Sequence, residues 1–237
     1  MSGTRALWVL EGLDGSGKAT QTELLCKRLS RMDVPFCKVT FPDYEQPSSA
    51  LVKLYLAGAF GASAQEVSPY AAASFYAVDR FASYRQFWQD DYRAGKTIVA
   101  DRYTTSNLIY QLTKLPRAQW GAFVRWLEDY EYDKLGLPRP SRVLYLDVPL
   151  TVSQKLLQER YQGDLAKKDL HERDFAFLEA CREAAFYSAD ALGWQVVSCC
   201  EGERLKPAER IHEEIWQHLT QEPGKETEEQ QRKDETG

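Results

Sequence analysis

A glycine-rich stretch that begins at Gly12 constrains the fold of this chain more than any other part of the sequence. The apolar run over residues 6–10 predicts a strand, the turn from Gly12 to Gly17 follows it, and Lys18 opens a segment with leucines at helical spacing. The order is strand, loop and helix. In that context the spacing Gly12-x-x-x-x-Gly17-Lys18 predicts a phosphate-binding loop, whose backbone N–H groups point into one concavity while Lys18 reaches the β and γ phosphates.

The alternative for this stretch is an ordinary glycine turn before a helix, but the strand and the helix that the motif requires are both present. One residue departs from the motif. Ala19 stands where a Ser or Thr hydroxyl usually helps to hold Mg²⁺, and the nearest hydroxyl is that of Thr20. The residues expected at the nucleotide phosphates are Gly12, Asp14, Gly15, Ser16, Gly17, Lys18, Ala19 and Thr20.

Length and charge limit the class of protein. The chain has 237 residues, of which 43% are hydrophobic, so one α/β domain over residues 1–220 is expected. The formal net charge of −5 argues against a general nucleic-acid or membrane-surface binder, although a small basic pocket can exist within an acidic protein. Residues 221–237 are almost devoid of apolar side chains, which predicts a solvated, disordered tail.

The cysteines and the absence of targeting signals point to the cytoplasm. Five cysteines show no paired metal-ligand spacing with the three histidines, so we expect reduced thiols. No signal peptide precedes the first strand, and no apolar run approaches the roughly 18 residues of a membrane span. A cytoplasmic protein without a membrane segment is therefore expected.

Five apolar segments alternate with helical patterns along the chain, and this alternation predicts a doubly wound parallel sheet surrounded by helices. The fourth segment is almost continuously apolar, as buried parallel strands are. Spacing between Thr151 and Gln154 fits a capping box at the start of a helix that runs to about Arg160. The expected strands are residues 6–10, 35–41, 97–100, 141–148 and 194–198.

A long aromatic helix is expected from Ser68-Pro69 to about residue 94, with Ser68 able to cap it. Its phenylalanines at positions 75, 81 and 87 are interpreted as core packing. Tyr76 and Arg80 share one helical face, and an aromatic ring and a cation near a phosphate loop suit stacking on a base and hydrogen bonding to it. From the pattern alone, core packing and base binding are equally good readings of Tyr76.

Asp101 and Arg102 follow the third strand, where α/β sheets bind their ligands. They could form a surface ion pair of little energetic value. Beside a phosphate loop, Asp101 can instead hold Mg²⁺ directly or through water, while Arg102 grips a phosphate. A polar and aromatic face follows, suited to binding a small polar ligand, and comprises Tyr103, Ser106, Asn107, Tyr110 and Gln111.

A charged interruption over residues 160–173 separates two helical segments. It reads either as an exposed loop or as a lid that closes over phosphates. The cations available there are Arg160, Lys167, Lys168 and Arg173.

Two motifs together are more specific than a phosphate loop alone: Glu-Gly-Leu-Asp-Gly-Ser-Gly-Lys from residue 11, and Asp-Arg-Tyr-x-x-Ser-Asn-x-x-Tyr-Gln from residue 101. With the Phe41-Pro42 loop, the Tyr76–Arg80 helix and the basic lid, they closely resemble the thymidylate kinase family over residues 6 to about 219. The resemblance implies a five-stranded parallel sheet, ATP as phosphoryl donor, Mg²⁺, dTMP as acceptor, and a homodimer.

The resemblance also implies roles for individual residues. Asp14 would accept a hydrogen bond from the 3′-hydroxyl of dTMP, Tyr76 would stack on thymine, and Arg80 would donate to its O4. Arg102 would hold the acceptor phosphate, and Asp101 would lie beside Mg²⁺. Asn107 would reach the base and Tyr110 would fill the space of a 2′-hydroxyl, while the acceptor loop would contribute Phe41 and Tyr44.

Two further departures from the family pattern change which residues are expected to bind the acceptor phosphate and to supply the catalytic cation. Tyr44 stands where many relatives carry an acceptor-binding Arg, which leaves more of that task to Arg102. Gly15 stands where some relatives carry an Arg after the loop Asp, and the resemblance then implies a catalytic cation from the lid. The expected catalytic set is Lys18, Asp101, Arg102 and one of Arg160, Lys167 and Lys168.

The reaction implied is transfer of the γ-phosphoryl group of ATP to dTMP, giving dTDP and ADP. Two alternatives stay open. One is a kinase for another nucleoside monophosphate or for a nucleoside. The other is a nucleotide-binding module without catalysis, for which Ala19 is the only encouragement.

Overall fold

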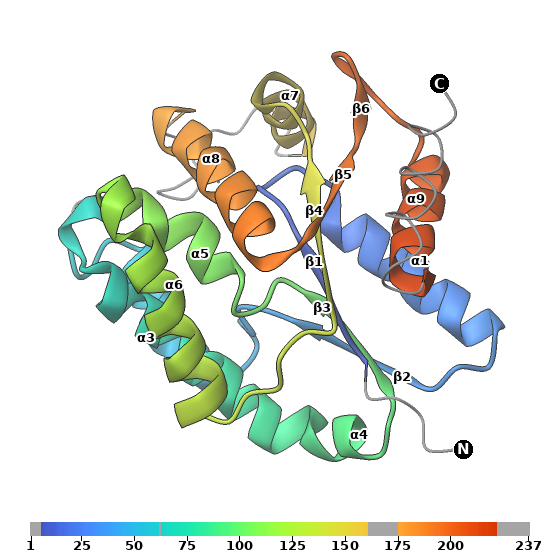
Figure 1. The fold of residues 1–237 in the computed structure, drawn as a ribbon, viewed down its shortest axis with the longest axis horizontal. Helices are drawn as coiled ribbons and strands as arrows, with labels where there is room; N and C mark the ends of the chain where they lie inside the picture. The colour runs from blue at the N-terminus through green and yellow to red at the C-terminus, as the bar shows by residue number, and fades with distance from the viewer. Residues whose placement is uncertain (1–5, 62, 161–174, 222–237) are drawn as a thin grey trace, which may run out of the picture.

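The computed structural model describes residues 6–61, 63–160 and 175–221, and its centre is a five-stranded parallel sheet (Figure 1). The strand order is β2-β3-β1-β4-β5, and every neighbouring pair runs parallel. This confirms the predicted fold class, and each strand lies where an apolar segment predicted it. The strands are β1 (Leu7–Glu11), β2 (Phe36–Thr40), β3 (Thr97–Asp101), β4 (Arg142–Asp147) and β5 (Gln195–Ser198).

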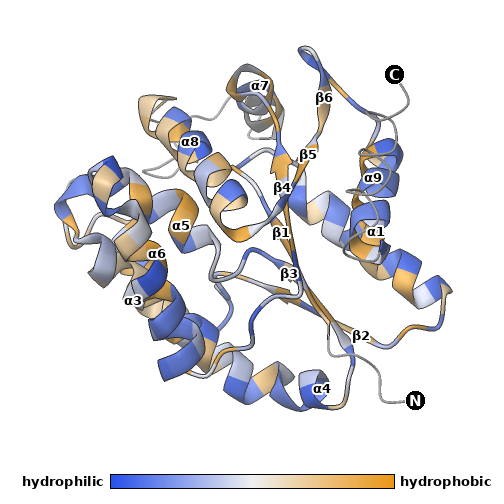
Figure 2. Ribbon diagram, viewed as in Figure 1, coloured by the Kyte–Doolittle hydropathy of each residue, from blue (hydrophilic) through white to orange (hydrophobic). Residues whose placement is uncertain are grey.

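Alternate residues of the strands enter two separate cores, because successive side chains point to opposite faces of a sheet. Helices α1 (Lys18–Arg31) and α9 (Ala208–Thr220) cover one face, where they pack on Leu10, Val99 and Leu144. Helices α3 (Pro69–Ser83), α5 (Ser106–Gln111), α6 (Trp120–Glu128) and α8 (Phe175–Leu192) lie on the other side. The central strands are hydrophobic along most of their length, as a sheet buried on both faces requires (Figure 2).

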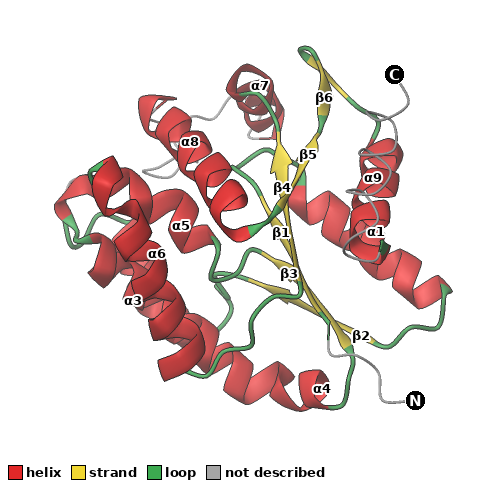
Figure 3. Ribbon diagram, in the orientation of Figure 1, coloured by secondary structure: helices red, strands yellow, loops and turns green. Residues whose placement is uncertain are grey.

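Shorter elements connect this framework (Figure 3). The predicted long helix is instead three consecutive pieces, because a π-helical segment separates α3 from α4. The hairpin β6–β7 before α9 contributes Leu205 to the pocket described below, and a second π-helix, η6, follows α6. The remaining elements are η1 (Pro47–Ser49), α2 (Ala50–Leu56), η2 (Ala64–Glu66), η3 (Tyr84–Trp88), α4 (Gln89–Arg93), η4 (Leu112–Lys114), η5 (Arg117–Gln119), η6 (Asp129–Lys134), α7 (Leu150–Arg160), β6 (Cys200–Glu201) and β7 (Arg204–Leu205).

Several local expectations were wrong. Phe81 and Phe87 are 38% and 52% exposed rather than core residues, whereas the partly buried Phe75 packs against Tyr55 at a ring-centroid distance of 6.2 Å. Helical spacing shows which side chains share a face of the helix, but it does not show whether another part of the chain covers that face. Ser68 makes no side-chain cap bond to α3. Helix α7 begins at Leu150, so Thr151 lies inside its first turn instead of capping it.

All five cysteines are free, as expected for reduced thiols. Among the described residues, no helix is both long and apolar enough to cross a membrane. The predicted tail lies outside the described residues apart from Gln221, and of the predicted lid only Arg160 falls inside them, at the last position of α7.

Candidate functional site

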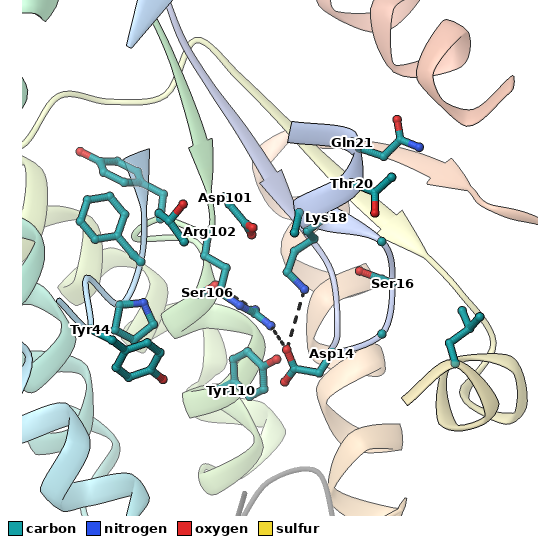
Figure 4. Close-up of a pocket in the computed structure, with 18 of the residues that line it drawn as sticks. Asp14, Ser16, Lys18, Thr20, Gln21, Tyr44, Asp101, Arg102, Ser106 and Tyr110 are labelled. Atoms are coloured by element: carbon teal, nitrogen blue, oxygen red, sulfur yellow. Dashed lines mark hydrogen bonds and ion pairs between the residues drawn. The ribbon is translucent and has the colours of Figure 1, made fainter. Parts of the chain in front are cut away.

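A cavity of about 820 Å³ opens at the carboxyl ends of the strands, where the phosphate loop after β1 faces the turn after β3 (Figure 4). This is the edge at which parallel α/β sheets bind ligands. Lys167 and Lys168 lie outside the described residues, and no side-chain position is described for Arg160. The other predicted site residues line the cavity with the single exception of Gly12: Asp14, Gly15, Ser16, Gly17, Lys18, Ala19, Thr20, Phe41, Tyr44, Tyr76, Arg80, Asp101, Arg102, Asn107 and Tyr110.

Gly12 supports the loop instead of contacting the cavity. A Cβ atom at this position would lie 2.4 Å from Ser16 Oγ and 2.9 Å from the carbonyl oxygen of Leu146, so no larger residue fits. Gly17 ends the loop in the left-handed conformation, with a φ of 87°, and α1 begins at the next residue. The loop therefore packs closely against β4 and presents the amino-terminal end of α1 to the cavity.

Lys18 is buried under the loop and is already oriented by it. Its Nζ donates to the carbonyl oxygens of Gly12 and Leu13 at 3.0 and 2.9 Å, and it lies 3.9 Å from Asp14. Burial, followed by the charge of Arg102, lowers the pKa of Lys18 to about 8, although Asp14 and two other carboxylates oppose the shift. A desolvated ammonium of this kind gains favourable interactions when a polyphosphate enters.

Arg102 occupies a strained backbone position, because its φ of 66° lies in the left-handed region that non-glycine residues rarely adopt. Its guanidinium points toward the phosphate loop. Nη2 donates to Asp14 at 2.6 Å, Nη1 lies 3.4 Å from Ser106 Oγ, and the group sits 5.3 Å from the ring centre of Tyr110. Lys18 at the start of α1 and Arg102 in the turn after β3 thus converge on Asp14 (Figure 4).

The turn that carries Arg102 is held by Glu11, a residue to which the sequence analysis gave no role. Glu11 is fully buried at the end of β1 and accepts three hydrogen bonds from this turn. The donors are the backbone N–H of Tyr103 at 3.1 Å, Thr105 Oγ1 at 2.7 Å and Ser106 Oγ at 2.7 Å. An acidic residue at the end of an apolar strand, directly before the loop glycine, is the sequence signal that could have identified it.

A second buried carboxylate, Glu131, lies under the opposite wall of the cavity. It comes from η6 and pairs with Arg80 through Nε at 2.8 Å and Nη2 at 2.5 Å, while Asn107 Nδ2 donates to it at 2.9 Å. Burial opposes the charge of Arg80, but Glu131 outweighs it and raises the pKa of the guanidinium. No motif surrounds Glu131, so the sequence gave no reason to select it.

The loop after β2 forms the outer wall of the same end of the cavity. Phe41 is buried, whereas Tyr44 is 47% exposed. Asp79 of α3 fixes this loop, since its carboxylate accepts from the backbone N–H of Asp43 at 2.9 Å and from Ser48 Oγ at 2.6 Å. Tyr76 lines the cavity and packs edge-on against the ring of Tyr55 at 6.3 Å, and its role at a base stays a prediction.

The other end of the cavity lies between α7, the β6–β7 hairpin and the start of α9. It is mainly apolar, with contributions from Leu156, Leu205 and Ile211. Gln21 of α1 joins these elements by donating from Nε2 to the carbonyl oxygen of Ala208 at 2.9 Å. The sequence analysis did not predict this wall, because the residues come from three segments with no shared motif.

Asp101 is the predicted metal ligand, and it lies in the cavity wall at the end of β3 with 9% of its surface exposed. Within the described ranges, no group of three His, Cys, Asp or Glu side chains could hold a metal ion by itself. Asp101 and Asp14 both act on Lys18, so two carboxylates face the phosphate-loop region. A hard oxygen set of this size fits Mg²⁺, which usually takes one or two carboxylates and completes its shell with phosphates and water.

Comparisons with known proteins agree with this geometry. The family model described as thymidylate kinase matches residues 10–215. A thymidylate kinase of Mycobacterium tuberculosis is 31% identical over 194 residues, covering 79% of this chain and 87% of that protein. A probable thymidylate kinase of Thermococcus gammatolerans is 29% identical over 154 residues, covering 64% of this chain and 70% of that protein.

A solved structure of the thymidylate kinase of Candida albicans has the same fold. Its TM-score is 0.64 at 22% sequence identity, and the match covers 90% of this chain and 89% of that one. The extent of the family match and the identity to the mycobacterial enzyme both lead to one conclusion. The chain belongs to the thymidylate kinase family.

Proposed function

We propose that this protein is an ATP-dependent dTMP kinase, which transfers the γ-phosphoryl group of ATP to dTMP and releases ADP and dTDP. One observation carries the proposal. Lys18 of the phosphate loop and Arg102 of the facing turn meet at Asp14, between an apolar end of the cavity and an end lined by Tyr76, Arg80 and Asn107. A donor nucleotide and an acceptor nucleotide therefore have separate places with their phosphates between them.

Positioning and charge neutralisation account for the chemistry. The acceptor phosphate is largely a dianion at neutral pH, so its oxygen needs no strong base before it attacks the γ phosphorus in line. The loop amides and Lys18 hold the donor phosphates, and Arg102 holds the acceptor phosphate, which brings two polyanions together. Asp101 is the residue that would hold Mg²⁺, which would shield the negative charge on the donor phosphates.

Base recognition is assigned to the wall made by α3 and α5. Tyr76 stacks on the thymine ring and Arg80 donates to O4, as the family resemblance implied. Gln111 is 1% exposed and lines the cavity, and its Oε1 has no hydrogen-bond partner among the described residues. A buried acceptor without a partner costs free energy until a ligand satisfies it, so we add Gln111 as a further hydrogen-bond acceptor for the bound nucleotide.

A homodimer and a cytoplasmic location form part of the same proposal. Exposed apolar side chains gather on the neighbouring helices α2 and α3 and on the segment after them, and a second copy of the chain would cover them. These side chains are Leu51 at 41% exposed, Leu54 at 46%, Val78 at 46%, Phe81 at 38% and Phe87 at 52%.

A panel of acceptors tests the activity. ADP release is measured with ATP, Mg²⁺ and each of dTMP, dUMP, dCMP, dGMP and thymidine, and dTMP is expected to give the highest kcat/KM. Greater activity on any other member of the panel would assign the protein to a different substrate. A protein that binds ATP but forms no dTDP in a single turnover would be a binding module instead.

A further inference from the structure

We propose that Glu131 is a positioning residue that selects 4-oxo over 4-amino pyrimidines, because its carboxylate fixes which hydrogen-bonding atoms Arg80 and Asn107 present to the base. The inference rests on the dTMP kinase activity proposed above. It assigns a specificity role to a residue that faces Arg80 and Asn107 rather than the cavity itself.

The geometry places one carboxylate behind both base-reading residues. Glu131 has no exposed surface, and it lies on the π-helix η6, which follows α6. Its two oxygens take the Nε and Nη2 groups of Arg80, and Oε1 also accepts from Asn107 Nδ2. Among residues that the structure describes, Glu131 thus joins α3 and α5 through side chains that are each 2% exposed.

The carboxylate determines the orientation of the Asn107 amide. Nδ2 has two neighbours, Glu131 Oε1 at 2.9 Å and the carbonyl oxygen of Ala73 at 3.3 Å. Both neighbours are acceptors only, so the amide must direct its NH₂ group toward them. The carbonyl oxygen Oδ1 is then the part of Asn107 that remains for the cavity, which Asn107 lines.

The same reasoning applies to Arg80. Glu131 engages Nε and Nη2, which holds the planar guanidinium by two parallel hydrogen bonds and leaves the Nη1 amino group for a ligand. The wall accordingly offers a donor from Arg80 beside an acceptor from Asn107. Thymine carries an acceptor at O4 beside a donor at N3–H and therefore matches this order. A 4-amino pyrimidine carries a donor beside an acceptor and mismatches both positions.

Replacement of Glu131 by Gln would weaken this constraint. A Gln side chain has a carbonyl and an NH₂ group, so it can pair with either orientation of Asn107, and only the longer contact of Nδ2 with the Ala73 carbonyl oxygen at 3.3 Å still favours Oδ1 toward the base. The loss should appear as relaxed discrimination, because mismatched buried polar groups are what reject the wrong ligand. An effect on folding alone would instead reduce activity on all acceptors by the same factor.

The test compares Glu131→Gln with the wild-type protein on dTMP and 5-methyl-dCMP, which keep the methyl group and differ only at position 4 and N3. We expect the ratio of kcat/KM for dTMP to that for 5-methyl-dCMP to fall at least about tenfold, the scale of one buried hydrogen bond. KM for dTMP should rise while KM for ATP stays unchanged. If the wild-type protein prefers dTMP and the variant keeps the same ratio, the role of Glu131 is rejected while the proposed dTMP kinase activity stands.

Glu128→Gln is the matched control, because Glu128 precedes η6, is 33% exposed and pairs with Arg139 on the surface at 2.8 Å. It should keep the wild-type ratio. If Glu131→Gln folds poorly because Arg80 loses its counter-charge, a double variant with Arg80→Met and Glu131→Gln removes both charges. That variant should bind dTMP weakly and show a ratio near one. Retention of the wild-type preference would reject the role of Glu131, whereas wild-type protein inactive on dTMP would reject the proposed kinase activity.

Discussion

At the scale of single residues, Lys18 carries the clearest functional prediction. Its ammonium is buried and donates to two loop carbonyl oxygens. When a nucleotide binds, charged phosphate oxygens replace these neutral acceptors. Lys18→Ala should lower kcat for dTMP by about a hundredfold or more, the effect of removing one transition-state donor. Steady-state ADP release measures it, and near-full turnover in the variant would show that Lys18 is not the transition-state cation.

The pKa of Lys18 adds a pH dependence. Because burial lowers that pKa to about 8, the free enzyme loses the ammonium charge as the pH rises through this value. kcat/KM for ATP reports the free enzyme and should therefore decline above about pH 8, while kcat should hold to higher pH because bound phosphates favour the charged lysine. In Lys18→Arg the decline should vanish, since a guanidinium stays charged throughout this range.

Lys114 provides the control for this profile, because burial also lowers its pKa to about 8 and it lies away from the phosphate loop, bonded to Tyr55 and Val67. Lys114→Arg should leave the decline in place. If the decline in kcat/KM disappeared in Lys114→Arg and persisted in Lys18→Arg, the titrating group would be Lys114, and the prediction for Lys18 would be wrong.

At the scale of elements, the site depends on the tie between β1 and the turn that joins β3 to α5. Glu11 makes this tie with three hydrogen bonds and thereby supports the strained backbone of Arg102. Glu11→Gln should destabilise the fold by about 1–3 kcal/mol, because a buried donor of the turn loses its acceptor. It should also raise KM for dTMP more than KM for ATP, since Arg102 is the acceptor-side cation.

Thermal unfolding and steady-state kinetics measure both effects. Glu23→Gln is the control, because Glu23 lies on α1, is exposed and pairs with Lys38 of β2 on the surface. It should change neither quantity. If KM for both substrates rose equally in Glu11→Gln, the tie would support the whole pocket and not the Arg102 turn in particular.

The sequence predicted those elements whose signal is local. The five strands follow from apolar runs, and the loop glycines with Lys18 follow from spacing within a few residues. Glu11 and Glu131 were not predicted, because their partners lie 92 and 51 residues away, at Tyr103 and Arg80, and only the folded topology brings them together. The apolar end of the cavity was missed for the same reason.

At the scale of the whole molecule, the exposed apolar face of α2 and α3 explains why periodicity misled the interpretation of Phe81. Helical spacing placed this side chain on an apolar face, and the single chain leaves 38% of it exposed, so a second copy is the proposed cover. Phe81→Glu would place a charge inside that interface, where an unpaired buried charge is costly. The variant should have the mass of one chain, whereas the wild-type protein should have the mass of two.

Sedimentation at micromolar concentration distinguishes the two masses, and activity on dTMP shows whether the monomer retains its cavity. Met32→Lys is the control, because Met32 is 53% exposed directly after α1, which lies on the opposite side of the sheet (Figure 1). It should leave a wild-type mass. Arg80 and Tyr76 belong to the same helix as Phe81, so loss of the partner should weaken the base-binding wall and raise KM for dTMP. If the wild-type protein sediments with the mass of one chain, the proposed homodimer is wrong and a second copy does not cover the apolar face.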